Sequence, residues 1–492
     1  MNQQKPSDPT LKLRGALPLA PAPERCPAPV PERLGHFIGG EVVPGRDESL
    51  FTSYEPATGE PLCQVAAADA EEVDRAVTAA RSAFDRVWGG MPGAERGKYL
   101  YRIARRIQER SRELAVLESR DNGKPIRETR DVDLPLVAAH FFYYAGWADK
   151  LDYAIPGQRV RPVGVAGQII PWNFPLLMAA WKLAPALATG NTVVLKPAET
   201  TPLTAMMLAE ILAEAELPPG VVNIVNGAGA TGAALVDHPG VDKIAFTGST
   251  EVGRIITRAT AGSGKRLTME LGGKGANIVF ADAALDQAVE GVIDGIFFNQ
   301  GQVCCAGSRL LIEEGIAAAF LDRLKRRIET LRIGDPLDKN TDVGALNSVE
   351  QLQRVQRYIE IGRRQGAAVW QGSACPTPEQ GYFVAPTLLT GVQQTDTVVR
   401  EEIFGPVLSV LTFRTPDEAI RKANDTEYGL AASVWTEKAS KLFEVAHALN
   451  SGVVWANGAN LFDPASPFGG MRHSGFGREG GIAGLWPYLE IQ

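Results

Sequence analysis

Two short motifs supply a possible acid–base group and a possible nucleophile. Glu270 lies in Met-Glu-Leu-Gly-Gly-Lys (269–274), where glycines follow a carboxylate in a turn. Cys304 lies in Gly-Gln-Val-Cys-Cys-Ala-Gly (301–307), among small residues after a polar pair. A carboxylate can act as a general base, and a cysteine becomes a nucleophile once a base or a positive field favours its thiolate. The two motifs together predict covalent chemistry through a cysteine.

A third motif could stabilise the charge that such chemistry creates. Asn173 lies in Pro-Trp-Asn-Phe-Pro (171–175). When a thiolate attacks a carbonyl carbon, negative charge develops on the oxygen, and a side-chain amide is a suitable donor to it. An asparagine between prolines and aromatic residues can equally serve only to hold a rigid turn. The motif taken alone leaves both interpretations open.

Cys304 also has a plain structural interpretation, because a free cysteine is usually a small core residue. Histidine is the usual base for a catalytic cysteine, and no histidine of this chain stands in a recognisable Cys/His signature; the five are His36, His140, His238, His447 and His473. Glu270 is therefore the better candidate base. Its presence in a motif of its own favours a catalytic role for Cys304.

These motifs, in this order, resemble the signatures of the NAD(P)-dependent aldehyde dehydrogenase superfamily, and the resemblance runs from about residue 36 to the C-terminus. It implies that Cys304, the fourth residue of Gly-Gln-x-Cys, is the nucleophile rather than Cys305. It also implies that Glu270 activates water, and that the Asn173 amide and the backbone N–H of Cys304 form an oxyanion hole. Residues 133–152 and 460–481 look somewhat closer to the family-16 branch, in which catalytic residues are sometimes lost.

The chain contains a glycine-rich turn that could bind a dinucleotide. Residues 227–232 spell GxGxxG after an expected strand, which by itself indicates a pyrophosphate loop. In the similar family this turn only approaches the nucleotide, so we expect Gly229 near the adenosine. The pyrophosphate is expected at Gly248 and Ser249, where a strand ending at Phe246 turns into a helix whose N-terminal amides favour an anion.

Other motifs bear on the choice of cofactor. Lys196 and Glu199 close another expected strand and suit hydrogen bonds to ribose hydroxyls. A carboxylate at Glu199 would repel a 2′-phosphate, so we expect NAD rather than NADP. The motif Glu-Glu-Ile-Phe-Gly-Pro-Val (401–407) resembles the nicotinamide-ribose site of the superfamily. The resemblance thus implies further cofactor contacts from Trp172, Phe246, Leu271, Glu402 and Phe404.

For the substrate, the resemblance points to a tunnel lined by large apolar side chains, namely Phe174, Met178, Trp181, Phe462 and Phe468. Residues 171–181 and 457–468 contain no Lys or Arg, and their only charged residue is Asp463. An anionic aldehyde would lack a partner there. We therefore expect neutral aliphatic or aromatic aldehydes, oxidised to carboxylic acids through a thioester on Cys304.

Three alternatives remain. A coenzyme-A-acylating relative would transfer the thioester to a thiol, but such relatives generally lack the glutamate at Glu270. A cysteine hydrolase without a nucleotide would leave Lys196, Glu199, Glu402 and Phe404 unexplained. An inactive scaffold of the same fold is the third possibility, and the intact Cys304, Glu270 and Asn173 weigh against it.

Composition excludes several other classes of protein. The 492 residues carry a net charge of −7 with no long basic run, so nucleic acid is not an expected partner. The sequence contains no run of 18 apolar residues, so no membrane span is expected. No metal site is expected either. Five cysteines, two of them adjacent, are a poor disulfide framework. They fit a reducing, cytoplasmic environment.

The order of expected elements predicts an α/β fold. Short apolar runs at 163–170, 192–195, 221–225, 243–246 and 276–280 alternate with helical stretches, which indicates a doubly wound parallel sheet. A second α/β series follows Cys304, with strands at 309–312 and 407–413 and helices at 317–331, 349–364 and 416–423. An amphipathic helix is expected behind Asp69, and another over 100–117, ending at Asn122-Gly123.

We expect a Rossmann-like NAD-binding domain (34–137 and 160–272) and an α/β catalytic domain (273–474). The resemblance adds a small bridging and oligomerisation β-element from 138–159 and 475–492. Residues 1–33 are rich in proline and are expected to form a semi-extended arm or a flexible leader. The pattern Phe-Phe-Tyr-Tyr-Ala-Gly-Trp (141–147) is expected to be a bridging strand too apolar to be exposed on a monomer, which predicts a homodimer or a larger homo-oligomer.

Overall fold

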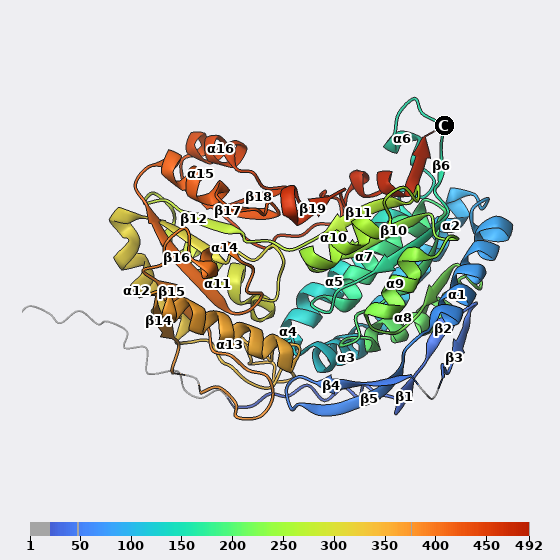
Figure 1. The fold of residues 1–492 in the computed structure, drawn as a ribbon, viewed down its shortest axis with the longest axis horizontal. Coiled ribbons are helices and arrows are strands. Elements are labelled where there is room, and N and C mark those ends of the chain that lie inside the picture. The colour runs from blue at the N-terminus through green and yellow to red at the C-terminus, as the bar shows by residue number, and fades with distance from the viewer. Residues whose placement is uncertain (1–19, 47–48, 375, 492) are drawn as a thin grey trace, which may run out of the picture.

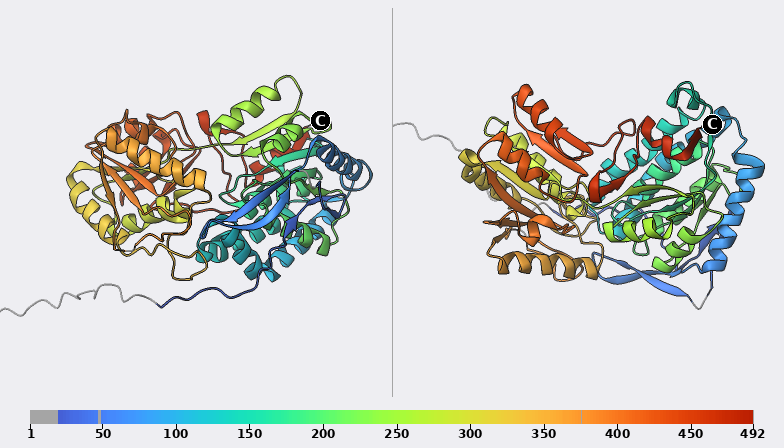
Figure 2. Two further views of the ribbon diagram at one scale, coloured as in Figure 1. Left: turned by 60° about the horizontal axis from the view of Figure 1, so that its bottom comes forward. Right: turned by 45° about the horizontal axis from the view of Figure 1, so that its top comes forward.

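A computed structural model describes residues 20–46, 49–374 and 376–491, and its architecture is α/β. Two large sheets with their helices form two lobes that lie side by side (Figure 1). Further views show that a β-ribbon connects the two lobes on one side (Figure 2). Within the described residues, no helix is long and apolar enough to cross a membrane.

The first lobe is built on an eight-stranded sheet of order β19-β11-β10-β7-β8-β9-β2-β3. Its five central strands are parallel and almost entirely buried, as expected for apolar runs covered by helices on both faces. They are β7 (Val165–Ile169), β8 (Thr192–Lys196), β9 (Val222–Ile224), β10 (Lys243–Thr247) and β11 (Arg266–Glu270). Antiparallel strands complete its edges, namely β2 (His36–Ile38), β3 (Glu41–Val43) and β19 (Gly475–Phe476).

The helices between these strands confirm the predicted alternation. They are α7 (Pro175–Ala188), α8 (Leu203–Glu214), α9 (Gly229–Asp237) and α10 (Thr250–Ala259). Further helices lie between β3 and the parallel strands in the sequence, namely α1 (Ala70–Ala83), α2 (Gly93–Glu109), α3 (Ser111–Asn122), α4 (Ile126–Glu128) and α5 (Leu134–Ala145). The predicted capping box of Asp69 and Glu72 starts α1. The single helix expected over 100–117 is instead α2 and α3, which meet at Arg110.

The second lobe is built on a seven-stranded sheet of order β14-β15-β16-β13-β12-β17-β18. Its strands are β12 (Ala276–Val279), β13 (Arg309–Glu313), β14 (Ala368–Gln371), β15 (Thr387–Thr390), β16 (Val407–Phe413), β17 (Ala431–Trp435) and β18 (Val453–Ala456). Its helices are α11 (Leu285–Phe297), α12 (Ala317–Ile328), α13 (Val349–Arg364), α14 (Thr397–Arg400), α15 (Pro416–Asn424) and α16 (Ala439–Ala448). The strand expected at 276–280 thus belongs to this sheet, so the chain crosses between lobes directly after β11.

The expectation of a bridging strand at 141–147 is wrong. This segment is the end of helix α5 and the turn that follows it. Phe141 and Tyr144 are three residues apart, share a helix face and are fully buried, with α5 packed on α2 and α7. The Tyr144 hydroxyl donates a hydrogen bond to the Gly481 carbonyl at 3.0 Å. Because this chain itself buries these apolar side chains, they do not require a partner subunit.

A two-stranded antiparallel ribbon does form nearby. It pairs β6 (Val160–Pro162) with β20 (Leu489–Ile491), and the short helix α6 (Leu151–Ala154) precedes it. The strand partner of the C-terminal segment therefore begins at Val160, just beyond the segment expected to supply it.

Part of the proline-rich leader is an extended arm on the protein surface; residues 1–19 lie outside the described residues. The backbone N–H of Glu24 donates to the Leu337 carbonyl at 2.7 Å, and the Glu24 carboxylate pairs with Arg112. The arm then enters β1 (Arg33–Leu34), in a three-stranded sheet with β5 (Glu60–Ala66) and β4 (Leu50–Glu55).

Candidate active site

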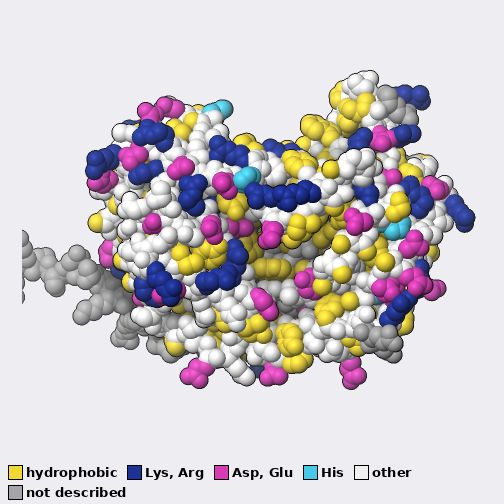
Figure 3. All heavy atoms as spheres, in the orientation of Figure 1, with side chains coloured by type: hydrophobic (Ala, Val, Ile, Leu, Met, Phe, Trp, Pro, Cys, Tyr) yellow, Lys and Arg dark blue, Asp and Glu magenta, His cyan; other side chains and the backbone are white. Residues whose placement is uncertain are grey.

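A cavity of about 270 Å³ lies between the two lobes and is lined by residues of both. The space-filling view shows a hollow there, with hydrophobic side chains inside it and Lys and Arg side chains on its rim (Figure 3). Asn173, Glu270 and Cys304 all line this cavity. The fold therefore brings together three residues that come from three separate motifs.

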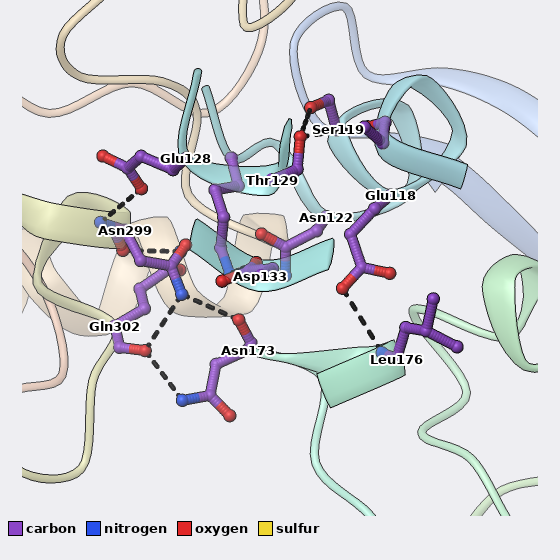
Figure 4. A network of polar contacts seen from close by, with 12 residues as sticks. Glu118, Ser119, Asn122, Glu128, Thr129, Asp133, Asn173, Leu176, Asn299 and Gln302 are labelled. Carbon is purple, nitrogen blue, oxygen red and sulfur yellow. Dashed lines mark hydrogen bonds and ion pairs between the residues drawn. The ribbon is translucent and has the colours of Figure 1, made fainter. Parts of the chain in front are cut away.

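Asn173 is held by the loop that joins β7 to α7. The Asn122 side chain donates to the Trp172 carbonyl at 2.6 Å, which fixes the chain just before Asn173. The Asn173 side-chain amide donates to the Gln302 carbonyl at 2.8 Å. An amide NH₂ group has two donor hydrogens, so this bond leaves one for a second acceptor in the cavity. Figure 4 shows this contact and the polar network behind it.

Cys304 follows an unusual turn. Helix α11 ends at Phe297, and the backbone then takes left-handed values at Asn299 (φ 46°), Gln300 (φ 54°) and Gly301 (φ 72°). A side chain at position 301 would collide with the Gly405 carbonyl, so only glycine fits. Cys304 is half-buried beside Cys305. The neighbouring Cys305 thiol, together with burial, holds the pKa of the Cys304 thiol well above its ordinary value.

Glu270 is the last residue of β11 and is almost fully buried. Neither of its carboxylate oxygens has a hydrogen-bond partner among the described residues, so both can accept from a water or a ligand. Burial raises the pKa of Glu270 well above its ordinary value, and the nearby charge of Glu479 raises it further. In the free cavity Glu270 and Cys304 therefore both favour their neutral, protonated forms.

The turn after Glu270 touches the loop of the nucleophile directly. A side chain at Gly273 would overlap the Cys304 carbonyl oxygen, so the backbones of the two motifs are in contact. The backbone N–H of Gly273 also donates to the Glu402 carboxylate at 2.8 Å. Burial raises the pKa of Glu402 to about 7. The glycines after Glu270 are thus required by close packing with Cys304 and Glu402.

Six of the expected cofactor residues line the same cavity, namely Trp172, Gly248, Ser249, Leu271, Glu402 and Phe404. Ser249 caps helix α10, and its hydroxyl accepts from the Val252 N–H at 3.2 Å. The rings of Trp172 and Phe404 meet edge to face at 5.3 Å. This end of the cavity combines a helix N-terminus, a carboxylate and an aromatic pair.

Four expected cofactor residues lie outside the cavity lining, namely Lys196, Glu199, Gly229 and Phe246. The Lys196 ammonium group is 3.5 Å from the Glu199 carboxylate, which is half exposed. A side chain added at Gly232, in the turn of Gly229, would lie 3.6 Å from Lys196 Cδ. Lys196, Glu199 and the glycine-rich turn are therefore neighbours, at the carboxyl ends of β8 and β9.

All five expected substrate residues line the cavity, and four of them are aromatic. Trp181 is 5.9 Å from Phe462 and 5.6 Å from Phe468, measured between ring centroids, and the two phenylalanine rings are 5.7 Å apart. Phe174 stacks on Phe298 at 6.1 Å. Among the described residues, no group of His, Cys, Asp and Glu is arranged to hold a metal ion.

Comparison with known proteins agrees with this geometry. The family model described as "Aldehyde dehydrogenase family" matches residues 42–492. The chain is 46% identical to the human mitochondrial aldehyde dehydrogenase, over 96% of this chain and 93% of that protein. The chain belongs to the aldehyde dehydrogenase family.

Solved structures of other aldehyde dehydrogenases share its fold. An NAD⁺ complex of the Bacillus cereus aldehyde dehydrogenase has a TM-score of 0.91 and 45% identity, and the match covers 94% of this chain and 96% of that one. A P. syringae indole-3-acetaldehyde dehydrogenase in complex with NAD⁺ and IAA has a TM-score of 0.90 and 42% identity, over 94% and 96% of the two chains. The weaker resemblance to the family-16 branch stays a prediction.

Several polar residues of this aldehyde dehydrogenase cavity carried no signal in the sequence. Glu479 lines it and forms a buried ion pair with Lys182, the residue after Trp181. Gln351 and Arg354 line it from helix α13. Their only pattern is a spacing of three on one helix face, which is common on any helix. They matter here because both donate to backbone carbonyls of residues 402–404, at 2.5 Å from Gln351 and 2.6 Å from Arg354.

The contact between the two cysteines gives a test of the thiol environment. Replacing Cys305 with Ala removes the neighbouring thiol that most raises the pKa of Cys304. The pKa of Cys304 should fall, so the thiolate fraction at neutral pH and the rate of alkylation by iodoacetamide should rise several-fold. The measurement is the alkylation rate of Cys304 against pH, followed by peptide mass spectrometry, with Cys304→Ala as the control. An unchanged or upward-shifted pH profile would contradict this description.

Proposed function

We propose that this aldehyde dehydrogenase works by covalent catalysis through Cys304. The Cys304 thiolate adds to the aldehyde carbon, and the negative charge on oxygen is received by the free N–H of the Asn173 amide and by the backbone N–H of Cys304. Loss of a hydride then converts the thiohemiacetal into a thioester. Glu270 removes a proton from water, which attacks the thioester and releases a carboxylic acid and the Cys304 thiol. The convergence of Cys304, Glu270 and Asn173 on one cavity carries this proposal.

NAD supplies the hydride acceptor in this reaction. The polar end of the cavity fits it, because the N-terminus of α10 with Gly248 and Ser249 suits a pyrophosphate. The Glu402 carboxylate suits ribose hydroxyls, and the aromatic pair of Trp172 and Phe404 suits a flat ring. Lys196 and Glu199 would bind the adenosine ribose, with Gly229, Phe246 and Leu271 completing the site.

The apolar end of the cavity favours neutral aliphatic or aromatic aldehydes. Phe174, Met178, Trp181, Phe462 and Phe468 offer large apolar surfaces. Among the described residues, the charged side chains lining that end are the two carboxylates of Glu270 and Glu479. The related P. syringae enzyme acts on indole-3-acetaldehyde, as its name states, which is a neutral aromatic aldehyde. Measuring NADH formation against a panel of neutral, anionic and cationic aldehydes tests the activity and this preference together. No NADH formation with any aldehyde would contradict the proposal.

The alternatives are less well supported. A coenzyme-A-acylating enzyme has no use for a buried carboxylate with free oxygens in the cavity of the thiol, as in Glu270. A hydrolase without a nucleotide leaves the polar half of the cavity without a ligand. An inactive scaffold leaves unexplained why three distant motifs present their reactive groups to one cavity.

The two halves of the mechanism can be separated by changing Glu270. Glu270→Gln keeps the size of the side chain but removes the base. Acylation and hydride loss should persist while hydrolysis slows, so rapid mixing should give one fast equivalent of NADH per site before a steady state at least about 100-fold slower than wild type. Wild-type turnover in the variant would remove Glu270 from the mechanism. Loss of both the burst and turnover would place Glu270 earlier, as the base for Cys304.

Cofactor choice is tested at Glu199. A 2′-phosphate beside its carboxylate is disfavoured by repulsion between like charges. We expect kcat/KM to be higher with NAD than with NADP by several-fold to about 100-fold. Glu199→Ser should narrow the difference chiefly by raising kcat/KM with NADP. A wild-type preference for NADP would contradict the assignment.

We also propose that the protein is a homodimer or a larger homo-oligomer in a reducing compartment such as the cytoplasm. Helix α10 exposes Val252 and Ile255, which are 41% and 55% exposed, and the C-terminal segment exposes Trp486 and Ile491. Such surfaces suit a partner subunit. The four described cysteines are free thiols, which supports the reducing compartment. Light scattering should give at least twice the chain mass, and Ile255→Glu should weaken assembly. A wild-type monomer at micromolar concentration would contradict the proposal.

A further inference from the structure

The turn that precedes the nucleophile is held by a residue far from it in the sequence. Asn299 is fully buried and has a left-handed backbone, which few non-glycine residues adopt and which asparagine tolerates better than most. Its backbone N–H donates to a carboxylate oxygen of Glu128 at 2.9 Å. Glu128 is the last residue of helix α4 in the first lobe and is 5% exposed. Glu128 therefore holds the turn of the second lobe from across the interface between the lobes.

The side chain of Asn299 connects this turn to the amide that faces the substrate. Its Nδ2 donates to the Asn173 backbone carbonyl at 2.7 Å and to the Gln302 carbonyl at 3.3 Å. The Asn173 side chain donates to the same Gln302 carbonyl at 2.8 Å. Figure 4 shows these residues as one continuous network. Asn299 thus contacts both the segment that carries the Asn173 amide and the chain that leads to Cys304.

We propose that Glu128 is a positioning residue for the oxyanion hole, acting through Asn299 on Asn173 and on the backbone before Cys304. This inference rests on the proposed mechanism and extends it to a residue that does not line the cavity. Without an acceptor at position 128, the buried Asn299 N–H loses its partner and the left-handed turn loses its restraint. Small displacements of an oxyanion donor lower the rate strongly, because the donor must meet the charge where it develops.

The inference predicts a graded series of variants. Glu128→Ala should lower kcat/KM for an aldehyde by about tenfold to 100-fold, while the affinity for NAD, measured by quenching of tryptophan fluorescence, stays within about twofold. Glu128→Gln keeps an acceptor oxygen and should stay within about threefold of wild type. Asp131→Ala, which removes an exposed carboxylate three residues away, is the matched control and should behave as wild type.

A double-mutant cycle distinguishes positioning from general loss of structure. If Glu128 acts through Asn173, Glu128→Ala should cause little further loss in an Asn173→Ala background. Fully additive losses would overturn the inference, and so would a Glu128→Gln variant as impaired as Glu128→Ala.

A second variant covers the case in which Glu128→Ala does not fold. Asn299→Asp keeps the shape and tolerates the left-handed backbone, but it replaces the Nδ2 donor with an acceptor facing two carbonyls. It should show the same loss of kcat/KM with unchanged NAD affinity, and wild-type kcat/KM would overturn the inference. Absence of aldehyde-dependent NADH formation in the wild-type enzyme would instead contradict the proposed function.

Discussion

The reaction centre depends on one close approach, that of the Cys304 backbone to Gly273. Gly273 follows β11, where the chain leaves the first sheet, and Cys304 follows α11 in the second lobe. Any side chain at position 273 would push the two segments apart. Glu270 comes directly before this turn, and the Gly273 N–H in the turn donates to the Glu402 carboxylate. The close approach of Glu270, Cys304 and Glu402 therefore depends on the absence of Cβ atoms at Gly272 and Gly273.

This packing has an electrostatic consequence. Burial raises the pKa of Glu270 and of Glu402, and the pKa of Cys304 is raised by the neighbouring Cys305 thiol and by burial. A neutral thiol is a poor nucleophile and a neutral carboxylic acid is a poor base, so these shifts work against the reactive forms of Cys304 and Glu270. Binding of a cation beside Cys304 would favour the thiolate. The oxidised nicotinamide ring carries such a charge, which would couple activation of the nucleophile to the presence of the hydride acceptor.

Much of the fold and site could be predicted because the signals are local. Buried parallel strands such as β8 and β10 are short β-branched runs, and Asp69 with Glu72 marks a helix start within four residues. Asn173, Glu270 and Cys304 each lie in a motif of their own. The strand expected at 141–147 was wrong because a short run of mostly apolar residues fits a buried helix as well as a buried strand. Glu128, Lys182 and Glu479 gave no signal, because each acquires its partner only when distant segments meet.

The central claim, that Cys304 carries the acyl group during turnover, can be tested by mass spectrometry. The wild-type enzyme would be quenched with acid during steady-state oxidation of a neutral aromatic aldehyde with NAD, and the peptide containing Cys304 and Cys305 would be fragmented. The account predicts an added acyl mass on Cys304 that is absent without NAD and absent in Cys304→Ala. An acyl group on Cys305, or turnover that persists in Cys304→Ala, would contradict it.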